Sequence, residues 1–271
     1  MNKTQKRSEE SSPETSSSLS RNKKIPRLYT CLSALLAICV WQAASMLFGN
    51  ELIFVSPFGV AKRLFELCGE FEFFSALLFT LKRILLGFLS GLAVGAPLAA
   101  LAAKFRIAEI LLAPYMVTIR SVPVASFTVV ALICFTAANL SWLISFLMVL
   151  PIVYTNLLDG FRATDEMLLE AASVFGMSHT ARLRFIYLPQ IKPFLISASK
   201  TAMGLAWKSG VAAELIGSPA GSVGEALYYT KLYIETADLF AWTVAIVLAS
   251  VICEKAFCFL LRRAFERSEK L

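Results

Sequence analysis

The sequence predicts an all-α, polytopic membrane protein with about six transmembrane helices, and three observations lead to this fold class. Of the 271 residues, 57% are hydrophobic and 17% are charged, whereas a soluble domain carries about a quarter charged residues. Apolar runs long enough to cross a bilayer recur along the chain. Lys and Arg gather between these runs with a bias that fits a membrane topology.

The first 27 residues are expected to form a disordered, serine-rich tail in the cytoplasm, and the membrane domain is expected to follow over residues 28–271. The serines stand among Lys, Arg and Glu, with almost no apolar side chain to bury. A secretory signal peptide is the alternative interpretation, because basic residues precede an apolar stretch. That stretch is longer than a typical signal core and no convincing cleavage site follows it, which favours a retained first span.

Six spans are expected, and the third contains two prolines. Because proline removes a backbone donor and clashes with the preceding helical turn, Pro114 and Pro123 predict a third span that is kinked or broken. The expected spans cover residues 28–48, 84–103, 107–135, 140–158, 193–213 and 239–261.

Small residues recur at every fourth position of the second span. This spacing lets two helices approach closely in lipid, where van der Waals contact drives their association. The pattern predicts a packing seam, and it leaves open whether the seam faces the same chain or a second copy. The residues are Gly87, Gly91, Gly95, Ala99 and Ala103.

The basic residues orient the chain in the membrane. With the N-terminus placed in the cytoplasm, the inner segments hold seventeen Lys and Arg and the outer segments hold five. This bias obeys the positive-inside rule. It predicts a multi-pass protein of the cell membrane with both termini and the loop between the fourth and fifth spans in the cytoplasm.

This cytoplasmic loop carries seven residues at fixed spacing, in the pattern EAA-x3-G-x9-I-x-LP. Four separate elements at fixed distances make the pattern specific, whereas a lone Glu-Ala-Ala would suit almost any surface helix. The residues are Glu170, Ala171, Ala172, Gly176, Ile186, Leu188 and Pro189.

The residue types explain what such a loop can do. Ala171 and Ala172 let a partner approach the backbone closely, and Gly176 can adopt the left-handed conformation that ends a helix. Ser178 can cap a second short helix, which Pro189 is expected to end. The stretch 168–189 is therefore expected to form a rigid knob of two short helices. The alternative is a pair of helices folded back over the loop's own apolar side chains, which does not explain a position between two membrane spans.

Ionisable residues within the spans are candidates for a solute pathway, because each costs about 2.5–3.5 kcal/mol at the bilayer centre. Arg120 lies close to Pro123, and Lys208 follows Gly204 on a polar, small-residue face of the fifth span. Glu214 follows at the outer end of that span. We expect Arg120, Gly204, Lys208 and Glu214 to line a passage whose positive charge favours an anion. The alternative for Lys208 is that its ammonium group reaches the lipid headgroups.

Enzyme chemistry and cofactors are not expected in this chain. His179 is the single histidine, and the six cysteines form no C-x-x-C pair, so the sequence offers neither a metal set nor a nucleophile with a base. The phosphate-binding pattern G-x-x-x-x-G-K-[ST] is missing from the sequence, which predicts that nucleotide binds to a separate subunit. The net charge of +7 is not gathered on one face with stacking aromatics, so nucleic acid is not an expected partner.

These motifs resemble those of the permease subunit of bacterial ABC importers in the aliphatic-sulfonate, taurine and nitrate group. Besides the knob, residues 56–60, 83–88, 120–123 and 206–214 are similar to this group. The resemblance covers about residues 50–265, with a family-like core over about 75–265. The family often has small apolar residues where Lys208 and Ser209 stand, so the cargo of this chain can differ.

The resemblance implies several partners. They are a second permease copy that forms a homodimer, two cytoplasmic ATPase subunits, an extracytoplasmic solute-binding protein and the lipid bilayer. It also implies that Glu170, Ala171, Ala172 and Gly176 dock into a cleft of the ATPase, whose closure on ATP turns an inward-facing passage outward. A secondary transporter without an ATPase is the alternative, but it would need an Asp, Glu or His relay at mid-bilayer. Sulfonates, nitrate, bicarbonate and small vitamin precursors all stay open as cargo.

Overall fold

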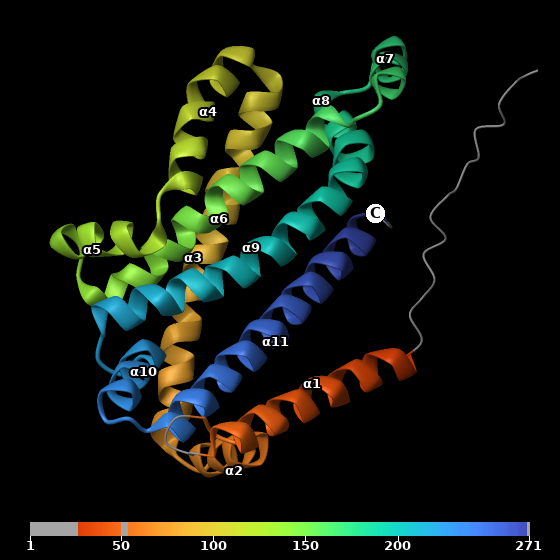
Figure 1. Ribbon diagram of the computed structural model, residues 1–271. Coiled ribbons are helices and arrows are strands. Elements are labelled where there is room, and N and C mark those ends of the chain that lie inside the picture. The colour runs from red at the N-terminus through yellow and green to blue at the C-terminus, as the bar shows by residue number, and fades with distance from the viewer. Residues whose placement is uncertain (1–26, 50–53, 270–271) are drawn as a thin grey trace, which may run out of the picture.

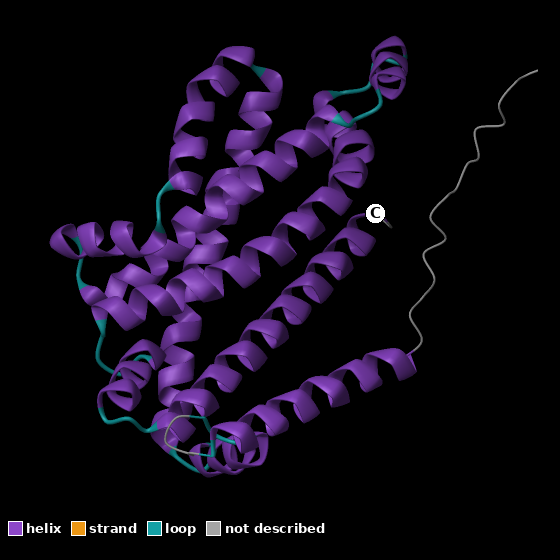
Figure 2. Cartoon of the chain, in the orientation of Figure 1, coloured by secondary structure: helices purple, strands orange, loops and turns teal. Residues whose placement is uncertain are grey.

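The computed structural model describes residues 27–49 and 54–269, and within these ranges its regular structure is helical throughout (Figures 1 and 2). The expected serine-rich tail lies outside the described residues, except for its last residue, Arg27. The elements are α1 (Arg27–Phe48), α2 (Pro57–Leu67), α3 (Phe71–Lys104), α4 (Arg106–Ser121), α5 (Val124–Cys134), α6 (Ala137–Arg162), α7 (Glu166–Val174), α8 (His179–Arg182), the π-helical turn η1 (Leu183–Tyr187), α9 (Leu188–Gly217), α10 (Val223–Leu232) and α11 (Thr236–Glu269).

Three of these helices, α3, α6 and α11, are long and apolar enough to cross a membrane. A fourth span is possible if α4 and α5 count together, although they meet at 102°. In α1 the apolar stretch is shorter, and α9 has 30 residues but carries Lys200 and Lys208. Length and composition thus give three or four spans among the described residues, and the expected number of six stays a prediction.

The third expected span is broken, as the prolines predicted. Val122 is extended, with φ −72° and ψ 129°, because a residue that precedes proline is pushed out of the helical region. Pro123 then precedes α5. Pro114 lies inside α4 and does not end it. The break therefore belongs to Pro123.

The second expected span begins earlier than the apolar run indicated. In the structure α3 starts at Phe71 rather than at residue 84. Phe73, Ala76 and Thr80 precede the apolar run at helical spacing and are buried. Their packing extends the helix at its N-terminal end, because tertiary contacts stabilise an amphipathic turn that is not apolar by itself.

The core is formed by α3, α6 and α9, and the small-residue seam of α3 faces α6 of the same chain. A Cβ atom added at Gly87 would lie 2.5 Å from the carbonyl oxygen of Trp142, and one at Gly91 would lie 2.6 Å from the Val149 side chain. These contacts leave no room for a side chain. The structure therefore answers the question that the sequence left open: the seam packs within one chain from Gly87 to Ala99, while Ala103 at its end is exposed.

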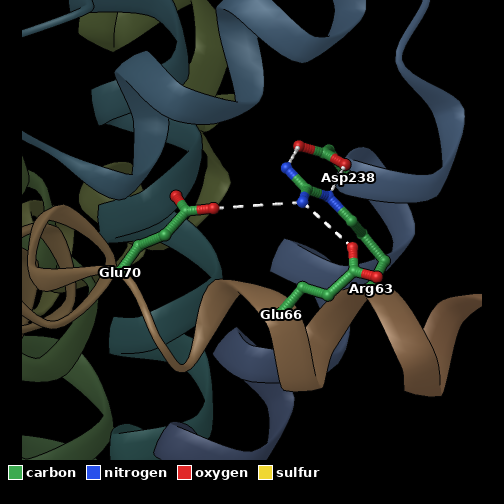
Figure 3. Close-up of polar contacts among 4 residues, drawn as sticks. All are labelled: Arg63, Glu66, Glu70 and Asp238. Carbon is green, nitrogen blue, oxygen red and sulfur yellow. Dashed lines mark hydrogen bonds and ion pairs between the residues drawn. The ribbon is translucent and has the colours of Figure 1, made fainter.

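The two ends of the bundle carry different short helices. Figure 1 shows α7 and α8 at one end and α2 and α10 at the opposite end. At the α2 end, Arg63 forms two hydrogen bonds with Asp238 at the start of α11, at 2.5 and 2.8 Å (Figure 3). The same guanidinium lies 3.2 Å from Glu66 and 3.9 Å from Glu70. The Asp238 carboxylate raises the pKa of Arg63 above its ordinary value, so α2 is tied to α11 by a permanent charge pair.

Candidate functional site

The first helix of the knob is capped at both ends by local hydrogen bonds. Asp165 Oδ1 accepts a hydrogen bond from the Met167 N–H at 2.9 Å, which begins α7. At its other end, Gly176 has φ +63°. The Met177 N–H donates to the Ala172 carbonyl at 2.9 Å and the Gly176 N–H donates to Ser173 at 3.1 Å. This is a Schellman turn with glycine at the left-handed position, and it confirms the conformation expected of Gly176.

The second helix of the knob begins as expected but does not end as expected. Ser178 Oγ accepts a hydrogen bond from the Ala181 N–H at 3.3 Å, so Ser178 caps α8. The expectation that Pro189 ends this helix is wrong, because α8 continues through η1 into α9. The Leu188 N–H donates to the Leu183 carbonyl, five residues back. This wide turn lies directly before Pro189, which has no N–H to donate.

Two side chains outside the predicted pattern fix the knob to its base. Arg182 donates from Nε to the Met177 carbonyl at 3.1 Å and from Nη2 to the Ala172 carbonyl at 3.4 Å. Gln190 Oε1 accepts a hydrogen bond from the Asp165 N–H at 3.1 Å. The two short helices are therefore bonded to each other and to the start of α9.

The seven residues of the pattern divide into an outward-facing group and an inward-facing group. Ala172 and Ile186 are buried, with 3% and 8% of their surface exposed, and Leu188 is half-buried. The other members lie on the surface of the knob, namely Glu170, Ala171, Gly176 and Pro189. The motif thus supplies buried residues that anchor the knob and exposed residues that form a face for contact with a partner.

Large apolar side chains are uncovered around this face. Val174 and Phe175 are each 84% exposed, Met167 is 77% exposed and Phe185 is 62% exposed. Two helices folded back over the loop's own apolar side chains would have buried these residues. The structure therefore contradicts that alternative, and such an exposed apolar patch is typical of a docking surface.

An ion network joins the base of the knob to the first half of the broken helix. Arg162, in the last turn of α6, pairs with Glu109 in the first turn of α4. Arg106 lies 3.0 Å from the same carboxylate. The sequence did not indicate this contact, because these residues resemble ordinary charges at the ends of spans.

The four expected pathway residues occupy different environments. Arg120 and Lys208 are exposed and Gly204 is half-buried. Among the described residues, neither Arg120 nor Lys208 has an ion-pair or hydrogen-bond partner. Glu214 is fully buried, and its carboxylate accepts a hydrogen bond from the Thr80 hydroxyl at 2.6 Å. The structure therefore separates Glu214 from the other three.

Comparison with known proteins adds to this geometry. The family described as "Binding-protein-dependent transport system inner membrane component" matches residues 91–270. The putative aliphatic sulfonates transport permease protein SsuC of Bacillus subtilis is 28% identical over 236 residues, which are 84% of this chain and 85% of SsuC. The taurine transport system permease protein TauC of Escherichia coli is 24% identical over 236 residues, 85% and 86% of the two chains. A crystal structure of an amino acid ABC transporter with histidines shares the fold, with a TM-score of 0.54, 21% identity and coverage of 72% of this chain and 94% of that chain.

Proposed function

The chain belongs to the family of binding-protein-dependent transport system inner membrane components, and from this membership we propose that it forms the translocation pathway of an ATP-driven importer. It is an ABC transporter permease of the importer type, as its similarity to SsuC and TauC indicates. We propose that two copies form a homodimer in the cell membrane. A separate cytoplasmic ATPase then drives transport, and an extracytoplasmic binding protein delivers the solute.

The observation that carries this proposal is the rigid knob with an uncovered apolar face at one end of the bundle. Val174 and Phe175 have no cover within the described chain. Glu170 and the small residue Ala171 lie on the same helix and are exposed. This combination suits a cleft on the ATPase, because small residues permit close approach and the apolar side chains give binding energy.

The stiffness of the knob suits it to transmit force. To invert a two-state equilibrium from 1:99 to 99:1, the ATPase must bind one state better by about 5.5 kcal/mol. A flexible loop would change its own conformation instead of passing this difference in binding free energy on to the membrane helices. The capped α7, the turn at Gly176 and the bonds from Arg182 hold the knob in one shape. The Arg162–Glu109 pair extends the connection to α4.

We propose that Arg120, Gly204 and Lys208 face the passage and that the cargo is a small anionic or polar solute. Lys208 is exposed on a helix that packs in the middle of the bundle, and a charge in that position is costly unless it lies beside water, a counter-charge or the lipid headgroups. Aliphatic sulfonates, which appear in the name of the relative SsuC, carry a negative charge. That charge agrees with the ammonium group of Lys208. Glu214 is fully buried, so it is left out of this lining.

The proposal is tested by purification of the tagged chain from its own host membrane, followed by identification of the bound proteins. We expect an ATPase subunit to co-purify and to hydrolyse ATP. Replacement of Phe175 with Ser should reduce the bound ATPase, while Thr243→Val on the distant helix α11 should not. Uptake that continues when ATP is depleted but the membrane potential is kept would contradict the proposal and favour a secondary transporter.

A further inference from the structure

A buried carboxylate joins two helices at the end of the bundle opposite the knob. Glu214 of α9 and Thr80 of α3 are both 0% exposed. The Thr80 hydroxyl donates to Glu214 Oε2 at 2.6 Å, across 134 residues of sequence. The other carboxylate oxygen, Oε1, makes no direct hydrogen bond among the described residues, while the Ser141 hydroxyl of α6 and the Gly224 N–H of α10 lie near the carboxylate. A buried polar group of this kind needs its bond to Thr80, because water does not reach it.

The same hydroxyl also holds the first residue of α10. The Val223 N–H donates to Thr80 Oγ1 at 3.1 Å, and Val223 is 0% exposed. This N–H lies in the first turn of α10, where the helix itself offers no acceptor. Because a backbone amide can only donate, Thr80 Oγ1 accepts from Val223, and the hydroxyl proton stays free to be donated to the Glu214 carboxylate. The two hydrogen bonds therefore run in one direction, from the Val223 N–H to Thr80 and from the Thr80 hydroxyl to Glu214.

Backbone packing places α10 directly against Glu214. A Cβ atom added at Gly224 would lie 2.3 Å from Glu214 Cβ, so only glycine fits there. The start of α10 is itself rigid, because Ser222 Oγ accepts from the Glu225 N–H at 3.0 Å and Glu225 Oε2 accepts from the Gly221 N–H at 2.6 Å. Three segments, α3, α9 and α10, thus meet at one buried joint.

We infer that Glu214 is a positioning residue that acts through Thr80 to hold α10 against α3 and α9, so that the three segments move as one body during transport. The part of this inference that concerns motion during transport rests on the proposed function, whereas the joint between the three segments does not. Glu214 contacts no open space, so it does not touch the solute.

The joint itself is tested on the purified full-length chain by hydrogen exchange of the Val223 amide. Thr80→Val keeps the shape of the side chain but removes the hydroxyl, and it should speed exchange at Val223 by about tenfold or more. Thr80→Ser keeps the hydroxyl and should restore protection to within about threefold of the native chain. Thr243→Val is the matched control, because in the described part of the chain the Thr243 hydroxyl bonds only to the Leu239 carbonyl of its own helix. If the Val223 amide exchanged at the native rate in Thr80→Val, the proposed joint would be wrong.

The role in transport is tested with a second variant that leaves both polar side chains in place. Gly224→Ala pushes α10 away from Glu214. In the complex with its co-purifying ATPase, Thr80→Val and Gly224→Ala should lower the uptake of the probe taurine per ATP hydrolysed by about tenfold, and Thr80→Ser should restore it. If uptake and ATP hydrolysis fell in proportion, the joint would serve only folding and the inference would fail. If no ATPase co-purifies, the proposed function fails, while the exchange result still decides whether the joint exists.

Discussion

Arg182 donates a hydrogen bond from Nε to the carbonyl oxygen of Met177, 3.1 Å away, and so bonds α8 to the turn that ends α7. Its Nη2 reaches the Ala172 carbonyl at 3.4 Å, an oxygen that the Met177 N–H also uses. The Arg182 guanidinium thus stabilises the left-handed turn at Gly176 through two hydrogen bonds to its backbone carbonyls. This contact explains how a knob with little core of its own keeps one shape.

Replacement of Arg182 with Ala should loosen the knob without unfolding the protein. The side chain is only half-buried, so we expect a loss of about 0.5–1.5 kcal/mol of local stability. Hydrogen exchange at the Met177 amide should become faster, and ATP-driven uptake should fall several-fold. Lys at this position keeps the charge but not the two-pronged geometry, so it should rescue little. Uptake at the native level with a loosened Met177 would show that stiffness is not required.

Replacement of Gly176 should act through the backbone. Its φ of +63° is easy for glycine and costs an alanine about 1–2 kcal/mol. Proline cannot adopt this φ at all. Gly176→Pro should therefore abolish uptake while the chain still inserts into the membrane, and Gly176→Ala should reduce uptake in part. Asn, which tolerates the left-handed region, is the matched control. Equal uptake in all three variants would count against the turn.

Replacement of Gly87 should test the seam between α3 and α6. A Cβ atom there would lie 2.5 Å from the Trp142 carbonyl and 2.7 Å from Ser145 Cβ. Gly87→Ala should lower the free energy of unfolding by about 1–3 kcal/mol, the usual range for overpacking. Leu86→Ala on the same helix is exposed and should change stability little. Thermal unfolding in one detergent compares the two, and equal melting temperatures would contradict the seam.

The Arg63–Asp238 pair should stabilise the end of the bundle that lies opposite the knob. Both side chains are only partly exposed, 32% and 14%, and the contact is two-pronged. A double-mutant cycle of Arg63→Met and Asp238→Asn should give a coupling energy of about 1–2 kcal/mol. Because Asp238 raises the pKa of Arg63, the guanidinium stays charged and this contribution should not change between about pH 7 and pH 10. A coupling energy near zero would show that the pair is a surface contact without effect.

Lys208 should affect transport and leave folding intact. It is exposed, and no described residue pairs with it. If the cargo is an anion, Lys208→Ala should raise the KM for uptake by about tenfold, and Lys208→Arg should retain most of the affinity. Lys255→Ala, which removes an exposed lysine of α11, is the control. Unchanged uptake in Lys208→Ala would remove this residue from the pathway.

Local chemistry in the sequence predicted local structure well. The turn at Gly176, the cap at Ser178 and the break at Pro123 follow from backbone preferences of single residues, and the structure has all three. Pro189 was interpreted wrongly, because a π-helical turn before it lets the chain stay helical. The five-residue bond from the Leu188 N–H to the Leu183 carbonyl has no signature in the residue types around it.

Contacts between segments that are distant along the chain could not be predicted from the sequence. Glu214 stands at the end of an apolar run, where an acid is ordinarily solvated, and the fold buries it beside Thr80 of α3, Ser141 of α6 and the start of α10. Arg162 and Glu109 likewise resemble ordinary charges at span ends until the fold pairs them. The small-residue spacing of α3 predicted close packing, but α6 as its partner emerged only from the structure.

The uncovered Val174 and Phe175 also bear on how a cell makes this protein. If the proposed ATPase covers these side chains, a chain made before that subunit would expose both of them to water, where they favour aggregation and proteolysis. Balanced translation of the subunits, or prompt capture of each new chain, would keep that tip shielded from the moment it appears.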